Sequence, residues 1–223
     1  MKRVINLDNW NRKEHFKFFS ALDDPFWGIT TTVDFTSIYQ QSKNMEVSFF
    51  LYSVHFLLKC INATTAFKLR IENGEVVEYD KINISPTIGR EDGTFGFGFF
   101  EYDTDLSLFI ENAEKEIHRV KNSTGLSFSK DTARADVIRY SALPWFAFSE
   151  MKHAGSIQTG DSIPKISTGK LIQEKKRLLL PISISVHHGL VDGRNVAEFI
   201  QNVKDGQNLS LIHISEPTRR RGI

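Results

Sequence analysis

The sequence predicts an α/β sandwich. Segments with helical periodicity alternate with strand-like segments along the whole chain, an order that favours helices packed on a sheet over a bundle or a barrel. Residues 178–187 are almost continuously apolar, which is typical of a central strand. The chain has 223 residues, of which 40% are hydrophobic, enough to bury a core of ordinary size. We therefore expect residues 1–208 to form one domain.

The N-terminal part is expected to hold two helices and a strand. Asp8 is placed to cap a short helix over Trp10–Phe19. Ile29–Phe35 is rich in β-branched residues and roughly alternating, which indicates a strand. Ser48–Asn62 is apolar almost all round, so it is predicted to be a buried helix.

Next in the chain comes a hairpin. Phe67–Ile71 and Val76–Tyr79 alternate on either side of the turn dipeptide Asn73-Gly74, the strongest hairpin signal in the sequence. Thr94–Tyr102 is predicted to be a further strand. Its two glycines suggest a strand that another segment approaches closely.

The C-terminal half continues the alternation. Leu106–Val120 has apolar residues at helical spacing and is expected to be an amphipathic helix. Three strands are predicted to follow, over Val137–Leu143, Ile163–Leu171 and Leu178–His187. A last helix should begin after Gly193. Residues 209–223 lack periodicity and end in a basic run, so we interpret them as a disordered or non-native tail, not as an interaction arm.

Composition excludes several classes of protein. Because Lys and Arg outnumber Asp and Glu by only 28 to 27, nothing in the charge indicates binding to nucleic acid or to a membrane. Cys60 is the only cysteine, which excludes an intrachain disulfide and a cysteine-rich metal site. The histidines show no metal-ligand spacing, so no metal is expected. No export signal or membrane span is apparent, and we expect a cytoplasmic protein.

The chemistry is expected at the end of the last strand, where the sequence reads His187-His188-Gly189-Leu190-Val191-Asp192-Gly193. Because side chains alternate across a strand, one imidazole should face the core side and the other a site at the strand end. A histidine can take up and return a proton near neutral pH, which suits a general base acting on a hydroxyl group.

This segment resembles the His-His-x-x-x-Asp-Gly signature of the coenzyme A-dependent acyltransferases, a family that includes chloramphenicol acetyltransferase and the catalytic domain of dihydrolipoamide acyltransferase. Trp10–Phe16 is similar to the Trp-x-Arg-x-x-His-Phe segment of the chloramphenicol acetyltransferases, and Ser141–Trp145 is similar to their Ser-Ala-x-Pro-Trp segment. The segments occur in family order, and the resemblance runs from about Leu7 to about Asp205.

The resemblance implies a two-layer sandwich with a mixed β-sheet and a set of roles. His188 would be the general base that lets the acceptor hydroxyl attack acetyl-CoA in a ternary complex. Ser141 would donate to the oxyanion, and Ser167 would hold a water near it. Asp192 would pair with Arg12 to brace the site, not act as the acid of a triad.

The resemblance also implies chloramphenicol as the acceptor and a homotrimer with its active sites between subunits. The candidate substrate-binding residues are aromatic: Phe18, Phe19, Phe26, Trp27 and Phe95. For each of them a place in the core is an equal alternative. Phe19 replaces a tyrosine of some members, so one hydrogen bond to substrate would be lost. Lys170 is a candidate for the phosphates of the coenzyme, the alternative being a solvated surface lysine.

Two other functions stay open at this point. One is an acyltransferase of the same fold acting on another hydroxylated xenobiotic or on a thiol. The dihydrolipoamide branch is disfavoured because the chain lacks a lipoyl domain and a flexible linker. The other is a non-catalytic protein that binds the drug, which would require the base to be lost or displaced.

Overall fold

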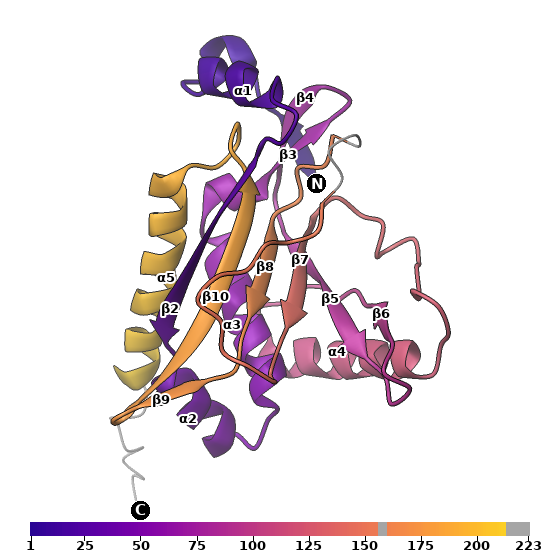
Figure 1. Ribbon diagram of the computed structural model, residues 1–223, viewed down its shortest axis with the longest axis vertical. Helices are drawn as coiled ribbons and strands as arrows, with labels where there is room; N and C mark the ends of the chain where they lie inside the picture. Colours follow the sequence, from indigo (N-terminus) through magenta and orange to yellow (C-terminus); the bar gives the residue numbers. More distant parts are fainter. Residues whose placement is uncertain (156–159, 213–223) are drawn as a thin grey trace, which may run out of the picture.

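The computed structural model describes residues 1–155 and 160–212, and in residues 208–212 only the course of the chain. Its centre is a mixed β-sheet in the order β2-β10-β8-β7-β5-β6, with β9 paired to the beginning of β10 (Figure 1). The strands are β2 Phe26–Asp34, β5 Asn83–Gly89, β6 Phe95–Phe97, β7 Val137–Ala142, β8 Lys165–Thr168, β9 Ile172–Glu174 and β10 Arg177–His187. Strands β5, β7 and β8 run parallel, and the other pairs are antiparallel, so the predicted mixed sheet is confirmed.

Helices cover one face of this sheet, which makes the fold a two-layer sandwich. The helices are α1 Lys13–Ser20, α2 Thr36–Asn44, α3 Phe49–Asn62, α4 Leu106–Lys121 and α5 Gly193–Ile212. Figure 1 shows α3 and α5 along one side of the sheet and α1 beyond the end of β10. A small second sheet pairs β1 (Lys2–Val4) with the predicted hairpin, β3 (Leu69–Glu72) and β4 (Glu75–Tyr79).

The two faces of the sheet differ in character. Along β10, Ile182, Ile184 and Val186 lie in the hydrophobic core, none more than 1% exposed. The alternate residues of β10 are Ser183, Ser185 and His187, which therefore face the side without helices. Neighbouring strands continue this pattern, and the face carries the side chains of Ser85, Thr87, Arg139, Ser141, Lys165 and Ser167. We call this surface the polar face.

Some local predictions were wrong. Asp8 does not cap α1; it lies in a short 3₁₀ helix, η1 (Leu7–Asn9), and its carboxylate binds Lys13 at 2.6 Å. Helix α1 begins only at Lys13. Before it, the chain forms two turns, in which the Trp10 amide donates to the Leu7 carbonyl and the Lys13 amide donates to the Trp10 carbonyl. The predicted strand Thr94–Tyr102 is ordered as a strand only over β6.

Elements α2, β1, β5 and β9 were not predicted, because the alternation or periodicity of their sequences is short or weak. Other segments were predicted to approach the glycines of Thr94–Tyr102 closely. At Gly96, side-chain atoms of Arg90, Val120 and Ser127 from the same chain lie within 3 Å of the position that a Cβ would occupy.

The chain end was predicted only in part. Helix α5 extends to Ile212, four residues into the range expected to be a tail, and residues 213–223 lie outside the described residues. Within the described ranges, no helix combines the length and the apolar character that crossing a bilayer requires.

Candidate active site

The two histidines at the end of β10 point to different surroundings. His187 is 4% exposed and lies edge-on to Phe26, with its Nδ1 accepting the Gly189 amide at 3.2 Å. Burial lowers the pKa of His187 to about 4. His187 is therefore neutral near pH 7 and ties the end of β10 to the turn that follows it.

His188 is half-buried and is held by packing. Its ring stacks on Phe19 of α1, with centroids 3.8 Å apart, and lies 5.3 Å from the ring of Trp27 on β2. Its amide donates to the Pro25 carbonyl at 2.8 Å, which continues the pairing of β10 with β2. The Nδ1 atom of His188 is buried and has no hydrogen-bond partner among the described residues. The ring is thus positioned by two aromatic neighbours and not by a carboxylate.

Arg12 and Asp192 form an ion pair beside this histidine. One carboxylate oxygen of Asp192 binds Arg12, and the other accepts the amides of Arg194 and Asn195 at the start of α5. Arg12 also donates to the His188 carbonyl at 3.2 Å. Partial burial raises the pKa of Asp192, but the hydrogen bonds from Arg12 and from the helix amides outweigh it, and the pKa is lowered. The pair braces both the His188 backbone and the beginning of α5.

Ser141 and Ser167 lie opposite each other on neighbouring strands of the polar face. Thr87 donates to the Ser141 hydroxyl at 3.2 Å, so the hydrogen of Ser141 is free to donate to another group. Ser167 is 1% exposed, and its hydroxyl lies 3.0 Å from Nε2 of His153. Two hydroxyl groups are therefore fixed side by side on the sheet.

His188 and Ser141 do not meet within one chain. Ser183 is in register with Ser167, and Ser167 with Ser141, so His188 lies five residues further along and two strands across. At the usual spacings of a sheet this places the two α-carbons about 19 Å apart. A base and an oxyanion donor that act on one reacting centre each lie about 3 Å from it. One chain therefore does not bring the two predicted catalytic residues to one reacting centre.

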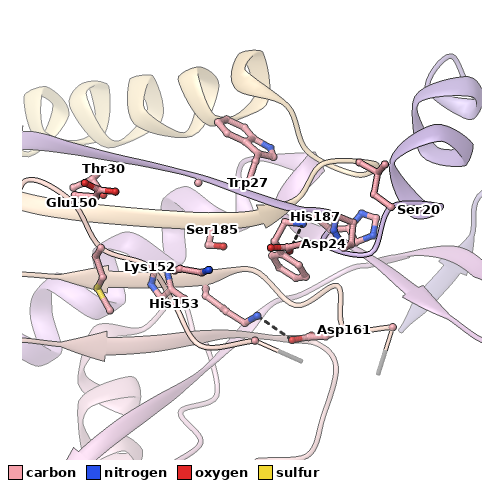
Figure 2. Close-up of a pocket in the computed structure, with 18 of the residues that line it drawn as sticks. Ser20, Asp24, Trp27, Thr30, Glu150, Lys152, His153, Asp161, Ser185 and His187 are labelled. Atoms are coloured by element: carbon pink, nitrogen blue, oxygen red, sulfur yellow. Dashed lines mark hydrogen bonds and ion pairs between the residues drawn. The ribbon is translucent and has the colours of Figure 1, made fainter. Parts of the chain in front are cut away.

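A cleft of about 690 Å³ opens on the polar face (Figure 2). The residues that line it include Phe26 and Trp27 on one side, the segment from Ser149 to His153 on the other, and Lys165, Asp161 and His187. In Figure 2, His153 and Asp161 lie on the side of the sheet that holds the cleft, whereas the Trp27 ring points toward the helix side, in register with the core residue Val186. Phe26 and Trp27 are the two predicted substrate-binding residues that line it.

The other predicted residues lie elsewhere. Phe18 is 64% exposed and makes an edge contact with Phe19, whose ring covers His188. Phe95 is 47% exposed on β6, the edge strand furthest from β2, so one chain does not bring it near His188. Lys170 is exposed after β8 and makes no ion pair within the part of the chain that the structure describes.

Sequence reasoning missed three residues of the cleft: Asp161, Lys165 and His153. Lys165 pairs with Asp161 at 3.2 Å, and both side chains are 7% exposed. Burial and the neighbouring Lys165 lower the pKa of His153. A signal was present for Lys165, because residues 165 and 167 of one strand share a face. Asp161 and His153 lie in an irregular segment, for which the pattern gave no signal.

Comparison with known proteins places this geometry in a family. The family model "Chloramphenicol acetyltransferase" matches residues 2–204. The chain belongs to this family. Its relatives include chloramphenicol acetyltransferase 3 of Escherichia coli, 28% identical over 93% of this chain and 97% of the relative. A chloramphenicol acetyltransferase of Clostridioides difficile is 27% identical over 90% of this chain and 93% of the relative.

Solved structures agree with the family. A chloramphenicol acetyltransferase structure superimposes with a TM-score of 0.85 at 30% identity, covering 93% of this chain and 100% of the other. A probable dihydrolipoamide acetyltransferase of Listeria monocytogenes shares the fold, with a TM-score of 0.66 at 13% identity. The chain is therefore a member of an acyltransferase family, with the predicted fold.

Proposed function

We propose that the protein transfers the acetyl group of acetyl-CoA to a hydroxyl group of chloramphenicol and so confers resistance to the drug. The observation that carries this proposal is the His188 imidazole, held between Phe19 and Trp27 at the end of β10 in a chain of this family. The ion pair of Arg12 with Asp192 fixes the backbone on which this imidazole stands.

The proposed reaction needs no acyl-enzyme. His188 removes the proton of the acceptor hydroxyl, and the oxygen attacks the thioester carbon directly. The Ser141 hydroxyl donates to the oxyanion that forms, an interaction worth about 3 kcal/mol when it is well aimed. When the carbon–sulfur bond breaks, His188 returns the proton to the coenzyme thiolate. The ester and the free thiol leave, and the imidazole is neutral again.

Ser167 has a supporting part in this scheme. It stands next to Ser141 in the sheet, with its hydroxyl held by His153. We propose that it holds a water molecule that also donates to the oxyanion. Lys170, exposed beyond the end of β8, is proposed to lie near the phosphates of the coenzyme. We propose that the enzyme uses acetyl-CoA in the cytoplasm, the location expected from the sequence.

We further propose that the active protein is a homotrimer. Support comes from the distance of about 19 Å between His188 and Ser141 in one chain, which leaves each of them without its partner. In a ring of three chains, the base of one subunit meets the serine of its neighbour. Such an arrangement would also bring Phe95, remote from His188 in its own chain, within reach of a neighbouring base.

The test is release of coenzyme thiol from acetyl-CoA in the presence of chloramphenicol. We expect the wild type to turn over and His188→Ala to lose nearly all turnover while drug binding, measured by calorimetry, persists. Equal turnover of the two proteins would contradict the mechanism. Drug binding without turnover by the wild type would favour a non-catalytic binder, and turnover only with other alcohols would favour a different acceptor.

A further inference from the structure

The Ser167 hydroxyl stands on a side chain whose torsion the strand alone does not fix. Ser167 lies on β8, between Ser141 of β7 and Ser183 of β10, and is 1% exposed. A serine carries one heavy atom on its Cβ, so its hydroxyl can occupy any of the staggered positions, whereas the second branch of a threonine restricts this torsion. A hydroxyl that holds a water molecule at one place must stay in one position. The restraint must therefore come from another side chain.

His153 supplies such a restraint. Its Nε2 lies 3.0 Å from the Ser167 hydroxyl, which is the one side-chain hydrogen bond of Ser167 among the described residues. Burial and the charge of Lys165 lower the pKa of His153, so the ring is neutral near pH 7. A neutral imidazole either accepts the hydroxyl hydrogen or donates to the hydroxyl oxygen, and both arrangements leave Ser167 a place for a water molecule. The contact thus selects a rotamer without using up the hydroxyl.

The segment that carries His153 is held against the polar face on both sides of this residue. Before it, the Met151 carbonyl accepts the Ser183 hydroxyl of β10 at 3.4 Å. After it, the Lys165 Nζ of β8 lies 3.2 Å from the position that a Cβ on Gly155 would take. The imidazole is therefore anchored through its backbone and not only through Ser167.

We propose that His153 is a positioning residue of the acetyl transfer, whose hydrogen bond holds the Ser167 hydroxyl in the position from which it binds the oxyanion water. The inference rests on the proposed function, which gives Ser167 this water. His153 acts on the reaction only through Ser167. Because the water meets a full negative charge only when the oxyanion forms, the effect of His153 falls on kcat and not on the binding of either substrate.

The test combines substitutions at the two positions and measures thiol release from acetyl-CoA with chloramphenicol. His153→Leu fills a similar volume without a polar atom. It should lower kcat by about threefold to tenfold, the range of one neutral hydrogen bond, and leave KM for both substrates within about twofold. Ser167→Ala should lower kcat by about tenfold, and adding His153→Leu to it should cause no further loss, because no hydroxyl is left to position.

The decisive comparison is rescue by Ser167→Thr. The methyl group of threonine restricts the torsion that His153 is proposed to fix. In the His153→Leu background, Ser167→Thr should restore kcat to within about twofold of the wild type, whereas damage to the segment would not be repaired in this way. His153→Gln, whose amide can reach Ser167, should keep kcat within about threefold of the wild type.

Ser183→Ala is the matched control. It removes the hydroxyl that binds the Met151 carbonyl, so it loosens the same segment without removing the contact between His153 and Ser167. This variant should keep kcat within about twofold of the wild type. A loss as large as that of His153→Leu would mean that the segment acts as a whole and would overturn the inference.

The remaining outcomes separate the inference from the proposed function. A wild type without turnover of chloramphenicol would overturn the proposed function and the inference with it. With an active wild type, unchanged kcat in His153→Leu, or no rescue by Ser167→Thr, would overturn the inference alone. A raised KM for chloramphenicol in His153→Leu would do the same, because it would assign His153 to substrate binding.

Discussion

Two inactive variants of this protein should restore activity to each other when they are assembled together. The register of the sheet puts the α-carbons of His188 and Ser141 about 16 Å apart along the strands and about 10 Å apart across them. Both cannot lie within about 3 Å of one reacting carbon in the same chain. If they act together, they do so from different subunits.

The size of the effect follows from this arrangement. Ser141→Ala alone should lower kcat by about a hundredfold or more, because it removes an oxyanion donor, and His188→Ala should lower it further. A cyclic trimer that contains both variants, in either ratio, has one site in three that combines an intact base with an intact serine. Trimers purified through both tags should therefore regain about a third of the wild-type rate, far above either variant alone.

The assay is co-expression of the two variants with different affinity tags, purification through both tags, and measurement of thiol release. The control replaces Ser141→Ala by a chain that carries both substitutions, which can form no intact site. If the mixed oligomer shows only the average rate of its two parents, the base and the serine do not act across subunits, and the reasoning from the sheet register is refuted.

Three further outcomes are expected. Asp192→Asn keeps a helix cap and removes the ion pair with Arg12, so it should lower the free energy of unfolding by about 2 kcal/mol. The loss is smaller than for a fully buried pair because the Asp192 side chain is 34% exposed. Urea denaturation measures it, and adding Arg12→Met to Asp192→Asn should change the result little. The pKa of His187 is about 4 in the folded state, below its unfolded value near 6.5, so the unfolded chain binds more protons between pH 4 and pH 6.5. The free energy of unfolding should therefore fall as the pH drops from about 6.5 to about 4. His187→Gln should flatten the dependence of the urea midpoint on pH. Burial raises the pKa of Cys60 to about 12, so its thiol should react with a thiol reagent only as fast as the protein unfolds; rapid labelling of the native protein would contradict this.

Local patterns explain why much of the fold was predictable. The Asn73-Gly74 turn fixed the hairpin because its residues occupy the left-handed conformation, with φ of 51° and 81°. Ser48 marked the start of α3, and its side chain accepts from the Leu51 amide. Short elements such as β9 and β1 escaped because three residues carry too little periodicity, and they exist only through their pairing with β10 and β4.

The motifs gave the residues of the candidate site but not their arrangement. The sequence by itself determined that Arg12, Ser141, His188 and Asp192 occur in the order of this family, since short segments carry that information. Tertiary structure decided that Arg12 meets Asp192 across 180 residues and that His188 and Ser141 stand far apart in one chain. The physical reason is that strand register and sheet order are set by packing between distant segments. The same packing buries Lys165 beside Asp161 in the cleft, whereas the pattern of its own segment indicates only that Lys165 shares a face with Ser167.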